Sequence, residues 1–437
     1  MDSFFKAGER GSSVGQELRA GLTTFLAMAY IIAVNPSLLV GAGIPASAAV
    51  TSTCLGAGIM TILMGLFANR PLACASGMGV NAVVAFTLTE VAGGDWHAAM
   101  GVIFLEGIAI LVLVLCGLRE AIMDAIPVSL RHAISVGLGL FIAMIGLHDG
   151  GIIVADESTM VAFGDVTSPT FIVGLVSIVA TIILYAMNVK GALLLGIVVA
   201  VIAGIPLGVT QMPTGIVSGL DFSAFAAPFQ GDADGVVGMA KVFASPTLLV
   251  FAFSLMMSDF FDTMGTAMAV GKQGEFLNED GTVENIREIL IVDSAAAAVG
   301  GFVGASSITT FVESTAGAAD GGRTGLTSIT TGALFVVSAF FAPLITVVSS
   351  AATCGALTFV GFLMMSEVTE IDWSDLLQGF PAFMIAAGVP LTYSISNGIG
   401  MGFIAYVIVA AVTGQVKRVK PLMWVATAAF VVYFLLV

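Results

Sequence analysis

Apolar segments of about 20 residues, the length that crosses a bilayer as a helix, follow one another along almost the whole chain. Fourteen such spans are predicted, seven on each side of one longer polar loop. They are 20–40, 48–67, 74–91, 98–118, 133–148, 169–187 and 191–209, then 246–270, 286–304, 306–320, 324–348, 353–366, 379–395 and 397–413. A last apolar piece, 421–437, is either a further short span or a helix at the membrane interface.

The composition supports this reading. The 437 residues are 58% hydrophobic and 10% charged, with a mean hydropathy of +1.06, too little charge to keep the surface of a soluble domain in water. The net charge of −15 argues against nucleic acid as a partner. The four cysteines lie singly in apolar segments without metal-ligand spacing, so no metal or cofactor is expected. The polar start of the chain predicts no cleaved signal peptide.

The basic residues predict the orientation of the spans. With the N-terminus inside, every lysine and arginine except Lys241 falls on the cytoplasmic side, as the positive-inside rule requires. These residues are Lys6, Arg10, Arg19, Arg70, Arg119, Arg131, Lys190, Lys272, Arg287, Arg323, Lys417, Arg418 and Lys420. We therefore expect a multi-pass protein of the cell membrane with a cytoplasmic N-terminus.

The two halves of the chain resemble each other. The third span of each half is rich in Gly, Ser and Thr near its start, at 75–88 and 305–322. Because each half has an odd number of spans, a duplicated half enters the membrane in the opposite direction. Interrupted spans at matching positions of inverted halves point to the binding site of a transporter. The alternative for the glycines is that small residues only let helices pack closely.

Polar residues beside these interruptions define a candidate site. Asp259 and Asp262 share one face of the eighth span, and Glu313 and Asn81 lie in the interrupted spans. Charged side chains at this depth face a cavity or a partner, because burial in lipid is costly. The set contains carboxyls and an amide but no lysine, arginine or histidine. It therefore suits a neutral planar heterocycle with N–H and C=O edges better than an anion. Two acids on one helix face cannot both ionise cheaply, so the pair can also carry a proton.

Six stretches carry a resemblance to a known family. They are "TTFLAMAYIIAVNP", "GMGVNAVVAFTL", "SDFFDTMGT", "GKQGEFLNEDGTV", "ITTFVESTAGAADGGRTGLTS" and "FVGFLMMSEVTEIDW". Together they resemble the AzgA-like purine permeases of the nucleobase–cation symporter-2 (nucleobase–ascorbate transporter) superfamily. The likeness runs from about Gly15 to Trp424, nearly the whole chain.

The resemblance implies an all-α polytopic fold of about 14 spans in a 7+7 inverted repeat, with spans 3 and 10 broken. It implies a core domain (20–118 and 246–348) and a gate domain (119–210 and 349–414) that move against each other like an elevator. The remaining segments are a cytoplasmic N-terminus (1–19), an extracytoplasmic loop (211–245) and a C-terminal tail (415–437). It leaves open whether two copies form a homodimer.

The resemblance also implies a function, the proton-coupled import of purine bases such as guanine, hypoxanthine or adenine. The substrate-binding residues it implies are Asn81, Asp259, Val312 and Glu313, with Asp262 supporting Asp259 in proton coupling. An enzyme is not expected.

The sequence is also compatible with other functions. A permease for xanthine, urate or a pyrimidine would need a similar site. An intramembrane aspartyl protease also buries two acids, but on two helices and with a GxGD stretch that this chain lacks. Among the remaining acids, Glu106 is either a second titratable site or, as we favour, a hydrogen-bond partner of a neighbouring helix. Asp293 is interpreted as compensating the dipole at a helix start, and Asp320 with Arg323 as shaping a turn.

Overall fold

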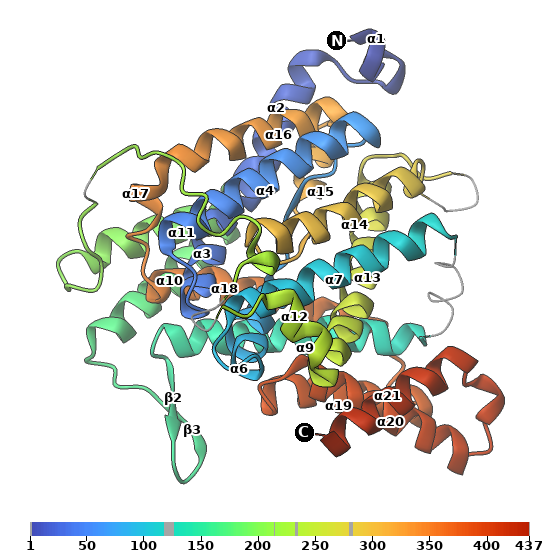
Figure 1. Cartoon of the computed structure of the whole chain (residues 1–437). Helices are drawn as coiled ribbons and strands as arrows, with labels where there is room; N and C mark the ends of the chain where they lie inside the picture. Colours follow the sequence, from blue (N-terminus) through green and yellow to red (C-terminus); the bar gives the residue numbers. More distant parts are fainter. Residues whose placement is uncertain (1, 118–125, 214, 232–234, 279–282, 437) are drawn as a thin grey trace.

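The computed structural model describes residues 2–117, 126–213, 215–231, 235–278 and 283–436 (Figure 1). Arg119 and the side chain of Asp262 lie outside the described part. The first half contains α1 (Asp2–Phe5), α2 (Val14–Met28), α3 (Ile31–Gly41), α4 (Ala46–Phe67), β1 (Cys74–Ser76), α5 (Met78–Val83), η2 (Val84–Leu88), α6 (Thr89–Val91), α7 (Trp96–Leu115), α9 (Val128–Asp149), β2 (Ile153–Asp156), β3 (Met160–Phe163), α10 (Pro169–Ala186) and α11 (Ala192–Gly204).

The second half follows η3 (Ala227–Phe229) and α12 (Gly238–Ala244). It contains α13 (Pro246–Gln273), α14 (Ile286–Val303), β4 (Ile308–Thr310), α15 (Ser314–Ala319), α16 (Gly325–Ser338), α17 (Ala342–Ile345), α18 (Ser350–Met364), η5 (Met365–Glu370), α19 (Leu376–Leu391), α20 (Ile395–Val412) and α21 (Pro421–Leu436).

The predicted all-α polytopic fold is confirmed. Each predicted span coincides with a helix or with a strand–helix pair, and the first is divided into α2 and α3 by a break at Ala29 and Tyr30. Seven helical segments of the described residues are long and apolar enough to cross a membrane, and shorter apolar helices accompany them. The last apolar piece forms α21, whose Phe430 packs edge-to-face on Phe403 of α20 at 5.6 Å between ring centroids.

The two interrupted spans meet each other. β1 of the third span and β4 of the tenth pair antiparallel, with Cys74 opposite Thr310, Ala75 opposite Thr309 and Ser76 opposite Ile308. Each strand leads into a short helix, α5 or α15. Extended backbone at membrane depth needs hydrogen-bond partners, and here each strand supplies those of the other.

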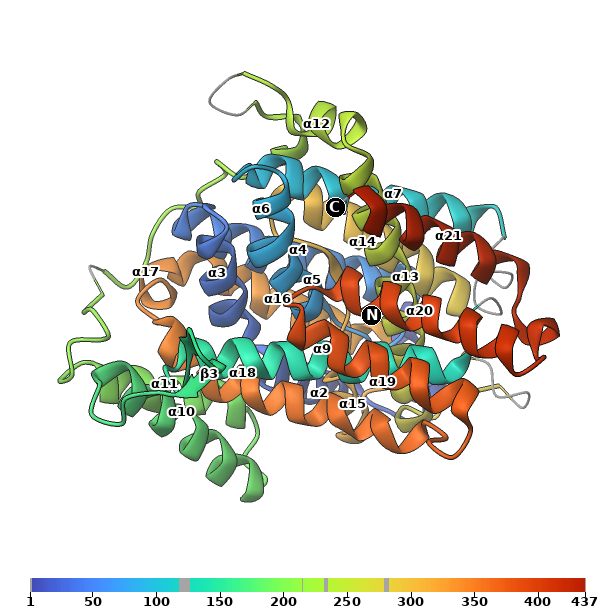
Figure 2. The ribbon, with the colours of Figure 1, turned by 90° about the horizontal axis from the view of Figure 1, so that it is seen from below.

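The helices pack in two groups. The first contains α2, α3, α4, α5, α7, α13, α14, α15 and α16. The second contains α9, α10, α11, α18, α19 and α20, of which α9, α18, α19 and α20 lie next to one another in Figure 2. Helices within a group contact one another extensively, whereas few contacts join the groups, mainly of α2 with α11, α3 with α18 and α5 with α9.

Small residues set the closest helix contacts. A methyl group added to Gly107 of α7 would lie 2.2 Å from the backbone nitrogen of Ala298 in α14. One added to Gly301 of α14 would lie 2.5 Å from the nitrogen of Phe104. Part of the glycine pattern therefore serves close helix packing, as the alternative reading of the sequence expected.

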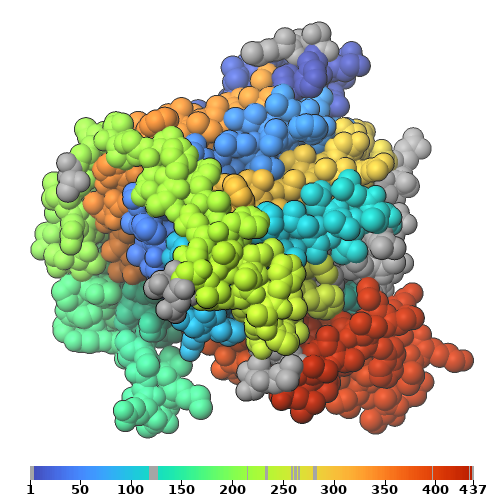
Figure 3. Space-filling view, viewed as in Figure 1, coloured from blue at the N-terminus to red at the C-terminus, as the bar shows by residue number. Residues whose placement is uncertain are grey.

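The segment between the halves lies across one face of the molecule, in yellow-green in Figure 3. Asp221 of this segment accepts a hydrogen bond from Ser47 at 2.5 Å, and α12 packs against α7. Lys241 of α12, the basic residue that departs from the predicted charge distribution, lies 2.8 Å from Oδ2 of Asp95 at the start of α7. Pairing with a buried carboxylate gives this lysine a local reason for its position.

Candidate functional site

A cavity of about 1680 Å³ lies between the two helix groups. Thr266 of α13 and Glu313 line it on one side, and His132 of α9 and Tyr185 of α10 on the other. Its basic lining residues, Arg131, Lys190 and Arg287, all belong to the predicted cytoplasmic side. Ligand pockets usually measure about 300–1,000 Å³, so this space is large enough for a small ligand.

Glu313 stands at the break between β4 and α15, where the chain turns into the short helix. Its Oε1 accepts a 2.6 Å hydrogen bond from the hydroxyl of Tyr30, at the break between α2 and α3. Tyr30 is 1% exposed. The neighbouring Val312, 51% exposed, also lines the cavity. The structure thus brings two of the predicted site residues to the cavity.

Asn81 and Asp259 lie off the cavity, buried in the helix group that carries Glu313. Asn81 of α5 donates from Nδ2 to the carbonyl of Ser76 at 3.3 Å, and its Oδ1 accepts no hydrogen bond from the described residues. Asp259 of α13 is 2% exposed. Thr266, seven residues further along the same face of α13, does line the cavity.

Asp293 has a role that the sequence reading missed. It lies in the interior of α14, and its carboxylate accepts hydrogen bonds from the Thr263 hydroxyl at 2.6 Å and the Thr310 backbone N–H at 2.8 Å. A longer bond comes from Thr309, at 3.2 Å. The interpretation as dipole compensation is therefore wrong. An acid so far beyond the first helical turn was the available signal, because the dipole effect fades within that turn.

Glu106 of α7 does not make the hydrogen bond to a neighbouring helix that the sequence reading favoured. The side chain is fully buried, and neither carboxylate oxygen has a hydrogen-bond partner among the described residues.

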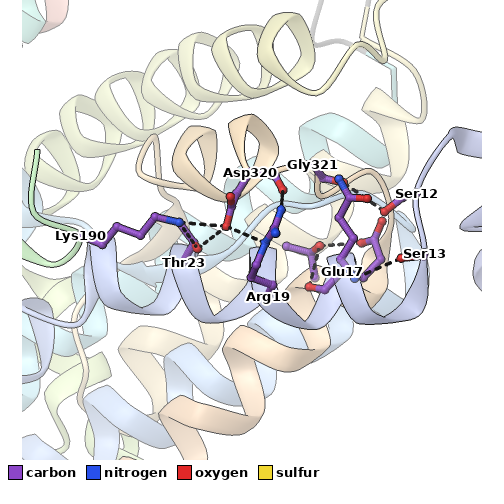
Figure 4. A network of polar contacts seen from close by, with 10 residues as sticks. Ser12, Ser13, Glu17, Arg19, Thr23, Lys190, Asp320 and Gly321 are labelled. Carbon is purple, nitrogen blue, oxygen red and sulfur yellow. Dashed lines mark hydrogen bonds and ion pairs between the residues drawn. The ribbon is translucent and has the colours of Figure 1, made fainter.

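Within the network of Figure 4, Lys190 joins the two helix groups at the predicted cytoplasmic surface. Asp320, which follows α15, accepts hydrogen bonds at Oδ2 from Lys190 at 3.0 Å and from Thr23 at 2.7 Å. Arg19 lies 3.4 Å from the same oxygen. Asp320 was predicted to shape a turn, and the structure shows it also contacting the α10–α11 connection. Arg323 does shape the turn, by donating to the carbonyls of Ala318 and Gly322.

Comparison with known proteins identifies the family. A family model described as "Permease family" (Xan_ur_permease) matches residues 15–401. The adenine permease AdeP of Escherichia coli is 38% identical over 431 residues, covering 99% of this chain and 95% of its own. The guanine/hypoxanthine permease PbuO of Bacillus subtilis is 37% identical over 440 residues, covering 98% of both chains. The chain belongs to this permease family.

Membership confirms the resemblance to the nucleobase permeases and the prediction that the chain is a multi-pass transporter and not an enzyme. Among solved structures, the transmembrane domain of the cyanobacterial bicarbonate transporter BicA matches with a TM-score of 0.62 and 16% identity, over 90% of this chain and 97% of that one. At this identity the match concerns the fold alone, and it agrees with the 7+7 inverted repeat.

Proposed function

We propose that this permease imports purine nucleobases together with protons, and that it works by an elevator-type movement of one helix group against the other. The relatives named as adenine and guanine/hypoxanthine permeases favour purine bases over other planar heterocycles. The observation that carries the proposal is the position of Glu313, whose carboxylate lines the cavity at a break in the membrane helices.

The chemistry of the site suits a purine. Glu313 and Oδ1 of Asn81, which accepts no hydrogen bond from the described residues, are both acceptors, and purine bases carry several N–H donors. Val312 supplies an apolar surface beside Glu313 for the planar ring. Asn81 and Asp259 join the site in this proposal when the base is bound, with Asp259 and Asp262 carrying the proton.

The packing of the helices supports the movement. The first helix group corresponds to the proposed core domain and the second to the proposed gate domain. Few contacts join them, and the cavity lies between them. A shift of the core group against the gate group would carry Glu313 and its ligand across the membrane without unpacking either group.

Uptake measurements test the proposal. Cells without purine permeases should accumulate radiolabelled hypoxanthine or adenine when they express this chain, and an excess of either unlabelled base should compete. In proteoliposomes, an inward proton gradient should drive accumulation by the wild type but not by Asp259→Asn. The matched control is Glu370→Gln, an exposed acid of η5 that does not line the cavity. Uptake of uracil or ascorbate without purines would refute the substrate class, and accumulation that ignores the gradient would refute proton coupling.

A further inference from the structure

The hydrogen bond from Tyr30 to Glu313 fixes one of the two carboxylate oxygens. Tyr30 is buried and its hydroxyl donates to Oε1 at 2.6 Å, a short distance typical of a charge-assisted bond. A buried tyrosine hydroxyl needs such a partner, and the break between α2 and α3 holds this one at the turn that carries Glu313. The carboxylate is therefore oriented before any ligand arrives.

We propose that Tyr30 is a positioning residue that makes Glu313 an obligate hydrogen-bond acceptor toward the ligand. With Oε1 occupied by Tyr30, the ligand meets Oε2, which can only accept. The site then selects bases that offer an N–H at that edge and rejects bases with a ring nitrogen acceptor or a methylated nitrogen there. This inference rests on the proposed function, in which Glu313 contacts the base.

The proposal predicts an unusual result for the amide variant Glu313→Gln. The Tyr30 hydroxyl requires an acceptor, so it holds the amide oxygen and turns the NH₂ group toward the ligand. Two donors then face each other and binding weakens. Adding Tyr30→Phe removes that requirement, and the amide can rotate to present its oxygen to the base. The double variant should therefore bind better than Glu313→Gln alone.

A merely structural role for Tyr30 predicts the opposite order. If Tyr30 only filled space or stabilised the helix break, the second substitution would add its own loss to the first. The sign of the interaction between the two substitutions thus separates a positioning role from a structural one.

The experiment measures equilibrium binding of radiolabelled hypoxanthine and adenine to the purified full-length protein and its variants. Tyr30→Phe should weaken binding by roughly three- to tenfold, because the carboxylate loses its orientation. Glu313→Gln should lose more, and the double variant should recover part of that loss. Tyr406→Phe, which alters another buried tyrosine, on α20, should bind like the wild type.

A double variant no better than Glu313→Gln, while the wild type binds purines normally, would overturn the inference and leave the proposed function intact. A wild type that binds no purine would overturn the proposed function, and this inference with it. A second measurement tests the inference without Tyr30→Phe, in case that variant folds poorly. The wild type should reject at least one hypoxanthine methylated on a ring nitrogen, and Glu313→Gln should lose that discrimination. Retained discrimination in Glu313→Gln would also overturn the inference.

Discussion

Lys190 and Asp320 join the two helix groups through a 3.0 Å ion pair at the predicted cytoplasmic surface. Lys190 lies in the connection between α10 and α11, and Asp320 follows α15, the short helix that begins beside Glu313. The pair thus links the second helix group to the element of the first group that carries the candidate site. If the groups slide past each other, this contact must break.

We therefore expect Lys190→Met to reduce the fraction of molecules in which the two helix groups stand as in this structure. An exposed ion pair contributes about 0.2–1 kcal/mol, which corresponds to a change of up to about fivefold. The measurement is the rate at which a maleimide labels Met268→Cys, which lines the cavity, in a background without the exposed Cys116. Labelling should slow with Lys190→Met and stay constant with Lys417→Met, an exposed lysine in the C-terminal tail. Equal rates in all three proteins would show that the pair does not hold the groups together.

Asp293 should contribute to the stability and the transport activity of the protein, because its carboxylate connects α13 and α14 to β4. Asp293→Ala leaves the Thr310 N–H and the Thr263 hydroxyl without this acceptor in a dry interior, at a cost of about 1–3 kcal/mol for each unsatisfied group. We expect strongly reduced uptake and a lower melting temperature. Asp293→Asn keeps one acceptor oxygen and should lie between Asp293→Ala and the wild type. If Asp293→Ala transported like the wild type, β4 would not depend on this carboxylate.

The pair of Asp95 and Lys241 predicts a defined pH dependence. Burial raises the pKa of Asp95, but hydrogen bonds from Lys241 and His97 outweigh this effect and hold the pKa below its ordinary value of about 3.9. A carboxyl with a lowered folded-state pKa stabilises the fold above its unfolded value and loses that contribution as the pH falls through the folded value. Asp95→Asn should therefore lower the melting temperature equally at pH 8 and pH 5.

The difference between Asp95→Asn and the wild type should shrink as the pH falls below about 4, where the unfolded chain binds the proton first, and should vanish once the folded protein is protonated at Asp95 too. Glu157→Gln, an exposed acid in the β2–β3 hairpin, is the control and should change little at any pH. A loss of stability in Asp95→Asn that appeared at pH 8 but not at pH 5 would contradict the assignment.

The fold followed from the sequence because span length and the positions of lysine and arginine depend on the membrane more than on side-chain packing. The interrupted spans could also be predicted, since Gly, Ser and Thr at membrane depth break helices in a recognisable way. Of the predicted site residues, Glu313 and Val312 line the cavity, whereas Asn81 and Asp259 do not. Asp259 and Thr266 share a face of α13, but only Thr266 lines the cavity, because that depends on how the two helix groups stand against each other. Tyr30 was missed for a related reason, since its partner lies 283 positions away in the chain.

Glu106 leads to the last prediction. The side chain is fully buried in α7, and its two oxygens have no hydrogen-bond partner among the described residues. A buried polar group without a partner destabilises a protein by about 1–3 kcal/mol, and an apolar side chain of similar length does not carry this cost. Glu106→Met should therefore raise the melting temperature of the purified protein. Glu106→Ala, which leaves a cavity instead, should not raise it.

If Glu106→Met proved less stable than the wild type, the carboxyl would have to be satisfied in the membrane by a group such as bound water. Uptake in the same variant then separates two roles: unchanged accumulation of hypoxanthine would mark Glu106 as structurally dispensable, and loss of accumulation with binding retained would place it on the proton route.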